Sequence, residues 1–261
     1  MAEFDSMELA VLSVPNEDSP RFAFAEACDR SEDPAWRARG EFIRLQLTLA
    51  ATEPRLIHNG KMYHERRREL DLLGLYGAQW AAPLAGLVTG FQFDRGFVEL
   101  VTLSARRFLE VAEELYRLAP VRHLNLTGAK DLMAELAASP ALRPIRSLSL
   151  ERARLTDADV ELLAQSQHVE GLRWLCLADN ELRLGAAEAL AASSGLPSLV
   201  YADFTGNYVD PCEQGGDDSG VIVAKWLTPA GMEIESRYGF RAWLHRAGET
   251  RETFHADRFR V

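Results

Sequence analysis

The chain has 261 residues, of which 47% are hydrophobic and 26% are charged, and its formal net charge is −10 at pH 7. This composition is typical of a globular protein and excludes disorder along the whole chain. Because a negative protein repels phosphate backbones, nucleic acid is not the expected partner. Glu3, Asp5 and Glu8 stand where a signal peptide would carry basic residues, which argues against such a segment.

Neither a membrane segment nor a cofactor site is expected. The chain has no run of about 18 apolar residues. It also lacks the glycine-rich loops that bind nucleotides and the histidine motifs that bind zinc. The cysteines, Cys28, Cys176 and Cys212, are far apart and show no CxxC spacing. Their odd number predicts free thiols and a cytoplasmic protein.

Residues 1–85 are predicted to form a helical N-terminal cap. Apolar residues recur there at helical spacing over about 6–13, 19–30, 34–51 and 61–76. Four polar residues in this segment are expected to hold its helices together, with a ligand site as the alternative; they are Arg21, Glu41, Arg44 and Gln46.

A β-hairpin is predicted next, over residues 86–103. Val88, Phe91 and Phe93 provide a strand pattern, and the turn residues Asp94-Arg95-Gly96 follow. The second arm of this hairpin is expected to lead into a set of similar strands.

A leucine-rich pattern then recurs along residues 86–210. The segment 172–182, LRWLCLADNEL, fits L-x-x-L-x-L-x-x-N-x-L at every fixed position, with Asn180 in the asparagine position. Related copies start at residues 98, 121, 145 and 199, so successive starts are 23, 24, 27 and 27 residues apart. This spacing lies within the roughly 20–29 residues of leucine-rich repeats.

The pattern predicts an α/β fold: a leucine-rich-repeat solenoid of about five repeats, with parallel strands on the concave side and helices on the convex side. The helices are expected at 105–119, 130–139, 157–166 and 185–194, with Thr156 capping the third. Asn180 is expected to satisfy backbone groups where the chain leaves its strand. The alternative is an ordinary α/β sheet with a similar periodicity.

The N-terminal segment resembles a known family. Residues 19–50, SPRFAFAEACDRSEDPAWRARGEFIRLQLTLA, are similar to the bacterial repeat-companion domain, which precedes leucine-rich repeats. Pro20-Arg21 and the run from Arg39 to Gln46 match, whereas residues 24–27 lack the family's tryptophan. With residues 77–103 included, the resemblance covers roughly residues 10–210. It implies an accessory or interaction module and brings no catalytic residues.

The residues between the leucines are expected to align in columns on the concave face. One column reads Glu99, Arg122, Arg146, Arg173, Val200, and the next two carry aromatic and polar residues. Because arginine and aromatic residues are enriched at binding hot spots, the predicted partner-binding residues are Arg122, His123, Arg146, Arg173, Trp174, Tyr201 and Asp203. The alternative is a set of solubilising residues held by Glu99, Glu151 and Asp179.

Residues 211–261 are predicted to form a β-rich C-terminal cap. A polar, glycine-rich loop at 211–220 is followed by short strands at 221–227, 232–238 and 240–246. The alternative is a small β-module that influences the choice of partner.

These features predict a scaffold or adaptor that binds a protein, not an enzyme. Neither the partner nor the oligomeric state follows from the sequence. One alternative is an immunity protein that neutralises a cognate toxin. A second alternative is an enzyme with its site between the solenoid and the tail, where Cys212, His245 or His255 would act.

Overall fold

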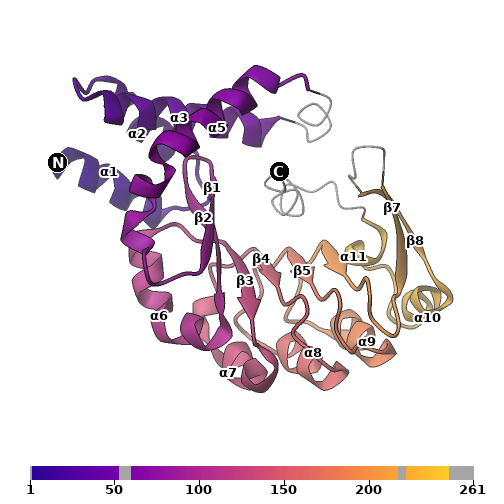
Figure 1. The fold of residues 1–261 in the computed structure, drawn as a ribbon. Helices are drawn as coiled ribbons and strands as arrows, with labels where there is room; N and C mark the ends of the chain where they lie inside the picture. The colour runs from indigo at the N-terminus through magenta and orange to yellow at the C-terminus, as the bar shows by residue number, and fades with distance from the viewer. Residues whose placement is uncertain (1, 53–59, 217–221, 247–261) are drawn as a thin grey trace. The chain divides into compact units, whose positions relative to one another are not determined.

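The computed structural model describes residues 2–52, 60–216 and 222–246. The chain forms two compact units (Figure 1). Unit 1 comprises residues 1–101 and 113–121, and unit 2 comprises residues 102–112 and 122–261. None of the described helices is both long and apolar enough to cross a membrane.

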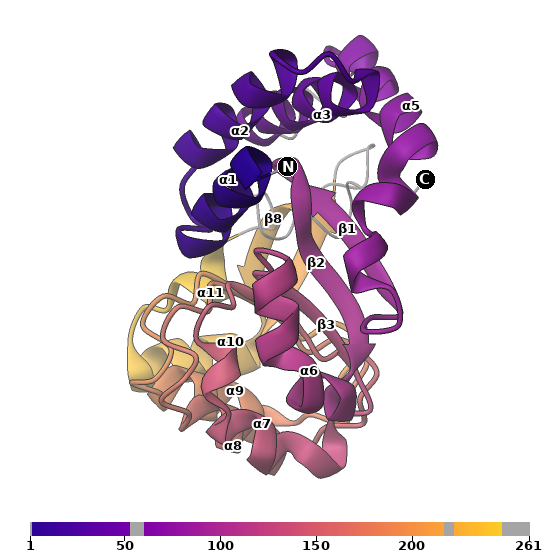
Figure 2. The ribbon, with the colours of Figure 1, turned by 90° about the vertical axis from the view of Figure 1, so that its left-hand side faces the viewer.

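Unit 1 is built on helices, as expected for its N-terminal part (Figure 2). They are α1 (Ala2–Ser13), α2 (Ser19–Asp29), α3 (Pro34–Ala51), α5 (Tyr63–Trp80) and the short η1 (Ala82–Leu84). Helix α3 packs against both α2 and α5. It begins where Asp33 Oδ1 accepts a hydrogen bond from the Ala35 amide at 2.8 Å, directly before Pro34. An acidic cap followed by proline is a favoured start for a helix.

Unit 1 contains a buried ionic cluster. The guanidinium of Arg95 makes a two-point contact with Glu99, at 3.0 and 2.7 Å. Arg21 reaches the same carboxylate at 2.9 Å, and Arg95 also pairs with Asp18 at 2.9 Å. Arg21, Arg95 and Glu99 are at most 1% exposed. Charges can be buried in this way because each is met by an opposite charge and by hydrogen bonds.

Gln46 joins three elements of unit 1. Its side-chain oxygen accepts from the Gly96 amide at 2.7 Å, and its nitrogen donates to Glu69 on α5 at 2.8 Å. Further bonds join α3 to its neighbours, from Arg68 to Glu41 and from Arg44 to Asp29. Glu41, Arg44 and Gln46 therefore join helices as expected, whereas Arg21 joins its helix to Glu99 of the ionic cluster.

The predicted hairpin is confirmed. Strand β1 (Gly90–Asp94) is followed after two residues by β2 (Phe97–Ser104). Both turn residues have positive φ, 49° at Arg95 and 88° at Gly96, as a two-residue type I′ turn requires. A Cβ atom on Gly96 would lie 2.5 Å from Ile43 Cγ1 and 2.9 Å from Ile43 Cα. The turn therefore needs glycine both for its backbone conformation and for its contact with α3.

One sheet contains six strands in chain order, from β1 to β6. Its later strands are β3 (His123–Thr127), β4 (Ser147–Ser149), β5 (Trp174–Cys176) and β6 (Tyr201–Asp203). These four are parallel, and Leu124, Leu148, Leu175 and Ala202 are register partners. The segments between strands are α6 (Ala105–Leu118), η2 (Lys130–Leu132), α7 (Met133–Ala138), η3 (Pro140–Leu142), α8 (Asp157–Ala164) and α9 (Leu184–Ala192). Helices α7, α8 and α9 lie side by side along β3–β6 (Figure 1).

The prediction of a leucine-rich-repeat solenoid with about five repeats is wrong. The structure is an α/β arrangement with one mostly parallel six-stranded sheet, and about 51% of the described residues are helical. The first expected copy, at residues 98–105, falls on β2 and belongs to the hairpin. The L-x-x-L-x-L spacing indicates a strand with buried leucines, and a buried parallel strand of an ordinary α/β sheet satisfies the same pattern.

Asn180 has the local role that was expected for it. Its Oδ1 accepts from the amides of Ala153 and Leu155, both at 3.0 Å. Its Nδ2 donates to the carbonyls of Leu150, Leu177 and Ala178, at 3.0, 2.9 and 3.1 Å. One side chain therefore satisfies buried backbone groups of two successive connections. The capping of α8 is confirmed as well, since the Thr156 amide donates to Asp159 at 2.8 Å.

The prediction of a β-rich C-terminal segment is wrong. An antiparallel hairpin, β7 (Cys212–Gly216) with β8 (Ile222–Leu227), is followed by helices α10 (Pro229–Tyr238) and α11 (Ala242–His245). The strands expected at 232–238 and 240–246 are therefore helical. Pro229 begins α10, and its Thr228 cap accepts from the Gly231 amide at 3.3 Å. The loop expected at 211–220 is wrong over 212–216, which form β7, while residues 217–221 and 247–261 lie outside the described residues.

Replacing Asn180 with alanine should lower the stability of the chain by about 3–4 kcal/mol, because buried backbone groups of two connections lose their partner. Urea unfolding, followed by tryptophan fluorescence, measures the change. Asn125→Ala is the matched control, since Asn125 is a half-buried residue of β3, and it should cost less than about 1 kcal/mol. Equal losses in the two variants would contradict the role given to Asn180.

Gly96→Ala should destabilise the chain by more than about 2 kcal/mol, because the new methyl group would meet Ile43 at a positive φ. Gly74→Ala provides the control. Gly74 lies within α5, and no atom lies within 4 Å of the place that a methyl group would take, so this change should add about 0.5–1 kcal/mol of stability. Urea midpoints of the two variants should thus shift in opposite directions.

Candidate functional site

Three arginines lie at matching positions at the N-terminal ends of neighbouring strands in unit 2. Arg122, Arg146 and Arg173 each immediately precede a strand, β3, β4 and β5 respectively. Their backbones are joined directly, since the Arg146 amide donates to the Arg122 carbonyl and the Arg173 amide to the Arg146 carbonyl, both at 2.8 Å. We call these three residues the arginine ladder. Each is half-buried, so the side chains remain within reach of solvent.

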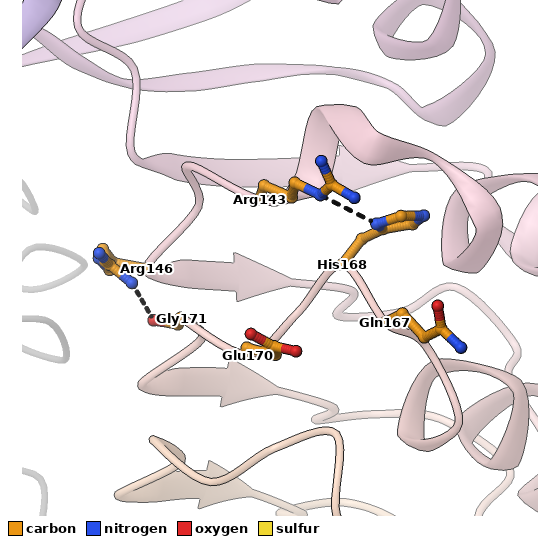
Figure 3. A pocket seen from close by; sticks show the side chains of 6 residues that line it. All are labelled: Arg143, Arg146, Gln167, His168, Glu170 and Gly171. Atoms are coloured by element: carbon orange, nitrogen blue, oxygen red, sulfur yellow. Dashed lines mark hydrogen bonds between the residues drawn. The ribbon is translucent and has the colours of Figure 1, made fainter.

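A hollow of about 380 Å³ adjoins the ladder at Arg146. It lies between the connections that precede β4 and β5, and it is lined by Arg143, Arg146, Gln167, His168, Glu170 and Gly171 (Figure 3). Arg143 Nε donates to His168 Nδ1 at 3.2 Å, and Arg146 Nη1 donates to the Gly171 carbonyl at 2.9 Å. Because guanidinium groups repel cations, the hollow suits an anion and not a metal ion.

The carboxylates that the alternative interpretation assigned to the ladder have other partners. Glu151 and Asp179 pair with Arg152, at 3.4 and 3.1 Å. Glu99 is fully buried in the ionic cluster of unit 1. Among the described residues, no carboxylate lies within 4.0 Å of Arg143 or Arg146. The positive charge of these two arginines is therefore not neutralised by a neighbouring acid.

Two of the three predicted columns are confirmed as register partners over β3–β6. His123, Ser147, Trp174 and Tyr201 are aligned across β3–β6, and so are Asn125, Ser149, Cys176 and Asp203. The rings of Trp174 and Tyr201 are parallel, with centroids 6.0 Å apart. Cys176 packs with them in a small apolar cluster.

The expectation that this face is exposed is wrong for three of the predicted residues. His123, Trp174 and Tyr201 are only 3%, 8% and 2% exposed. Within unit 2, the hydroxyl of Tyr201 donates to Gln214 on β7 at 2.7 Å, and the amide of Gln214 donates to Asp203 at 3.2 Å. The C-terminal hairpin therefore covers the end of the sheet where the sequence placed a free surface.

A lysine fixes the C-terminal segment on β6. Lys225 Nζ donates to the carbonyls of Ala202 and Trp243, both at 2.8 Å, and lies 4.7 Å from the centre of the Tyr201 ring. Burial lowers the pKa of this amine, because it disfavours the charged form. One cation thus joins β8, α11 and β6, and α11 packs against both strands.

The cysteines are free thiols, as predicted, and all three are buried. Burial raises the pKa of Cys176 to about 12 and that of Cys212 to about 11, because the thiolate is desolvated. Cys212 Sγ lies 3.1 Å from the Leu244 carbonyl, and His245 Nε2 lies 2.7 Å from Glu235 Oε1. His255, the third residue of the enzyme alternative, lies outside the described residues.

The sequence interpretation missed most of the hollow. Arg143, Gln167, His168, Glu170 and Gly171 lie in connections and not in the aligned columns, so the repeat register gave them no role. Gln214 and Lys225 were missed because their partners are distant in sequence. The sequence signal that could have indicated the hollow is the pair Arg143 and Arg146, which lie three positions apart just before β4.

Alkylation by iodoacetamide at pH 8 should be at least about 100-fold slower at Cys176 and Cys212 in the folded chain than in urea, because the reactive thiolate is scarce when the pKa is raised. Mass spectrometry of tryptic peptides gives the rate at each cysteine. The urea-unfolded chain is the control. Rapid labelling of folded Cys212 would instead favour the enzyme alternative.

Comparisons with models of protein families, with curated proteins and with solved structures give no match. The resemblance of residues 10–210 to the repeat-companion family stays a prediction. Function is therefore inferred from the geometry of the arginine ladder and of the adjoining hollow.

Proposed function

We propose that the chain is a protein-binding scaffold or adaptor that works in the cytoplasm. Its partner docks along the arginine ladder of unit 2 and over the hollow beside Arg146. The buried part of the sheet face, with Trp174 and Tyr201, supports the ladder from within and does not contact the partner.

The observation that carries this proposal is the fixed alignment of three like charges. Hydrogen bonds between the backbones of Arg122, Arg146 and Arg173 hold these residues on adjacent strands, about 4.8 Å apart. A row of aligned arginines complements an acidic partner in charge and in hydrogen-bond donors. Arginine is also among the residues that dominate binding energy at protein interfaces.

Several features favour an acidic protein as this partner. The ladder and the hollow present arginine guanidinium groups, whose charge and N–H donors complement carboxylates. The hollow also presents Glu170, and a carboxylate there can accept hydrogen bonds from a peptide backbone. The immunity-protein alternative, with a basic toxin as partner, receives no support from a basic ladder.

Affinity purification from the native cell tests this proposal, with the full chain as bait. The variant Arg122→Gln/Arg173→Gln should lose the captured partner, because it removes two of the three ladder charges. The matched control is Arg106→Gln/Arg107→Gln, which removes two charges at the start of α6 and should retain the partner. The purified partner should then bind the chain at least about 10-fold more weakly when the ladder is neutralised.

Folding of the variants is checked by urea unfolding, since the ladder arginines are half-buried. A partner that binds both variants equally would move the interface away from the ladder. A folded chain that captures no protein would oppose the scaffold proposal.

A further inference from the structure

Two arginines line the hollow, and each donates one side-chain hydrogen bond within it. Arg146 is directed by Gly171, whose carbonyl accepts from Nη1 at 2.9 Å. A Cβ atom on residue 171 would lie 1.9 Å from the same nitrogen, so the guanidinium occupies the space that a side chain would fill. The position of Arg146 therefore depends on the absence of a side chain at Gly171.

Arg143 is directed in a similar way from the opposite end of the hollow (Figure 3). Its Nε donates to His168 Nδ1 at 3.2 Å. Since a guanidinium has five N–H donors, each arginine retains donors after its one side-chain bond to His168 or Gly171. These remaining donors and two positive charges are available to a ligand.

The two groups that direct the arginines are a histidine ring nitrogen and a backbone carbonyl, and neither is a carboxylate. Neither guanidinium has a carboxylate within 4.0 Å in the part of the chain that the structure describes. A carboxylate is the group whose two oxygens match the fork of a guanidinium. The hollow thus has the charge and the donors for such a group, together with the space that its volume of about 380 Å³ provides.

We infer that the hollow is a subsite for the carboxylate of an aspartate or glutamate on an acidic protein segment. Arg146 contacts this carboxylate, and Arg143, at the opposite end of the hollow, contacts a second acidic residue of the same segment, while Glu170 accepts from N–H groups of that segment. Glu170 and the exposed lining, which includes Gln167, disfavour a small multiply charged anion such as phosphate. This inference rests on the proposed function and specifies the chemistry of the partner.

Fluorescence anisotropy of a fluorescein-labelled peptide of alternating glutamate and glycine tests the subsite with the full chain. The analogous glutamine peptide is the control for charge. The labelled glutamate peptide should bind, and its affinity should fall when salt is raised from about 50 to about 300 mM, since the contact is ionic and accessible. The glutamine peptide should bind at least about 10-fold more weakly.

Three variants locate the contact. Arg143→Gln/Arg146→Gln should weaken binding of the glutamate peptide by at least about 10-fold, whereas Arg106→Gln/Arg107→Gln should change it by less than about 2-fold. Gly171→Ala keeps every charge but displaces Arg146, so a loss of about 3- to 10-fold is expected. The backbone of Gly171 is outside the left-handed region, so alanine fits its conformation.

Two outcomes would overturn the inference. The first is a wild-type chain that does not bind the glutamate peptide, or that binds it equally well as Arg143→Gln/Arg146→Gln. The second is inorganic phosphate that binds more tightly than the peptide and competes with it. If the partner capture still depends on Arg122 and Arg173 in either case, the proposed function stands and only the subsite fails.

Discussion

The burial of one column of apolar residues sets the geometry on which the rest of unit 2 depends. Leu124, Leu148, Leu175 and Ala202 are register partners across β3–β6, and each is at most 2% exposed. A slip of one residue would turn buried side chains to the other face, so the register is strongly fixed. Every other alignment, including that of the arginines two residues before the leucines, follows from this constraint.

The same register that buries the leucines forces like charges together. The ladder arginines cannot separate, because their backbones are hydrogen bonded to one another. In unit 1, by contrast, the arginines are paired with an acid: Arg21 and Arg95 both contact Glu99 and are fully buried. The paired charges of unit 1 are buried, whereas the charges of Arg143 and Arg146 are available to a partner.

Long-range contacts decide which part of the sheet is accessible. Lys225 and Gln214 bring the C-terminal hairpin onto Tyr201 and Asp203, so the aromatic column becomes interior. The ladder lies at the N-terminal ends of the strands, and its residues keep part of their surface. At these strand ends the sheet and its short connections hold the backbone of each arginine in place. Binding a partner there therefore costs less conformational entropy.

The sequence by itself determined the N-terminal helices, the hairpin turn at Arg95-Gly96, the register of β3–β6 and the role of Asn180. These features depend on local periodicity, turn chemistry and one repeated spacing, and each of these can be recognised within a short stretch of sequence. Only the tertiary structure decided the six-stranded sheet, the helices after β8, the burial of Trp174 and Tyr201, and the hollow at Arg143 and Arg146. A strand with buried leucines has the same pattern in a solenoid and in an ordinary sheet, and contacts between residues distant in sequence leave no periodic signal.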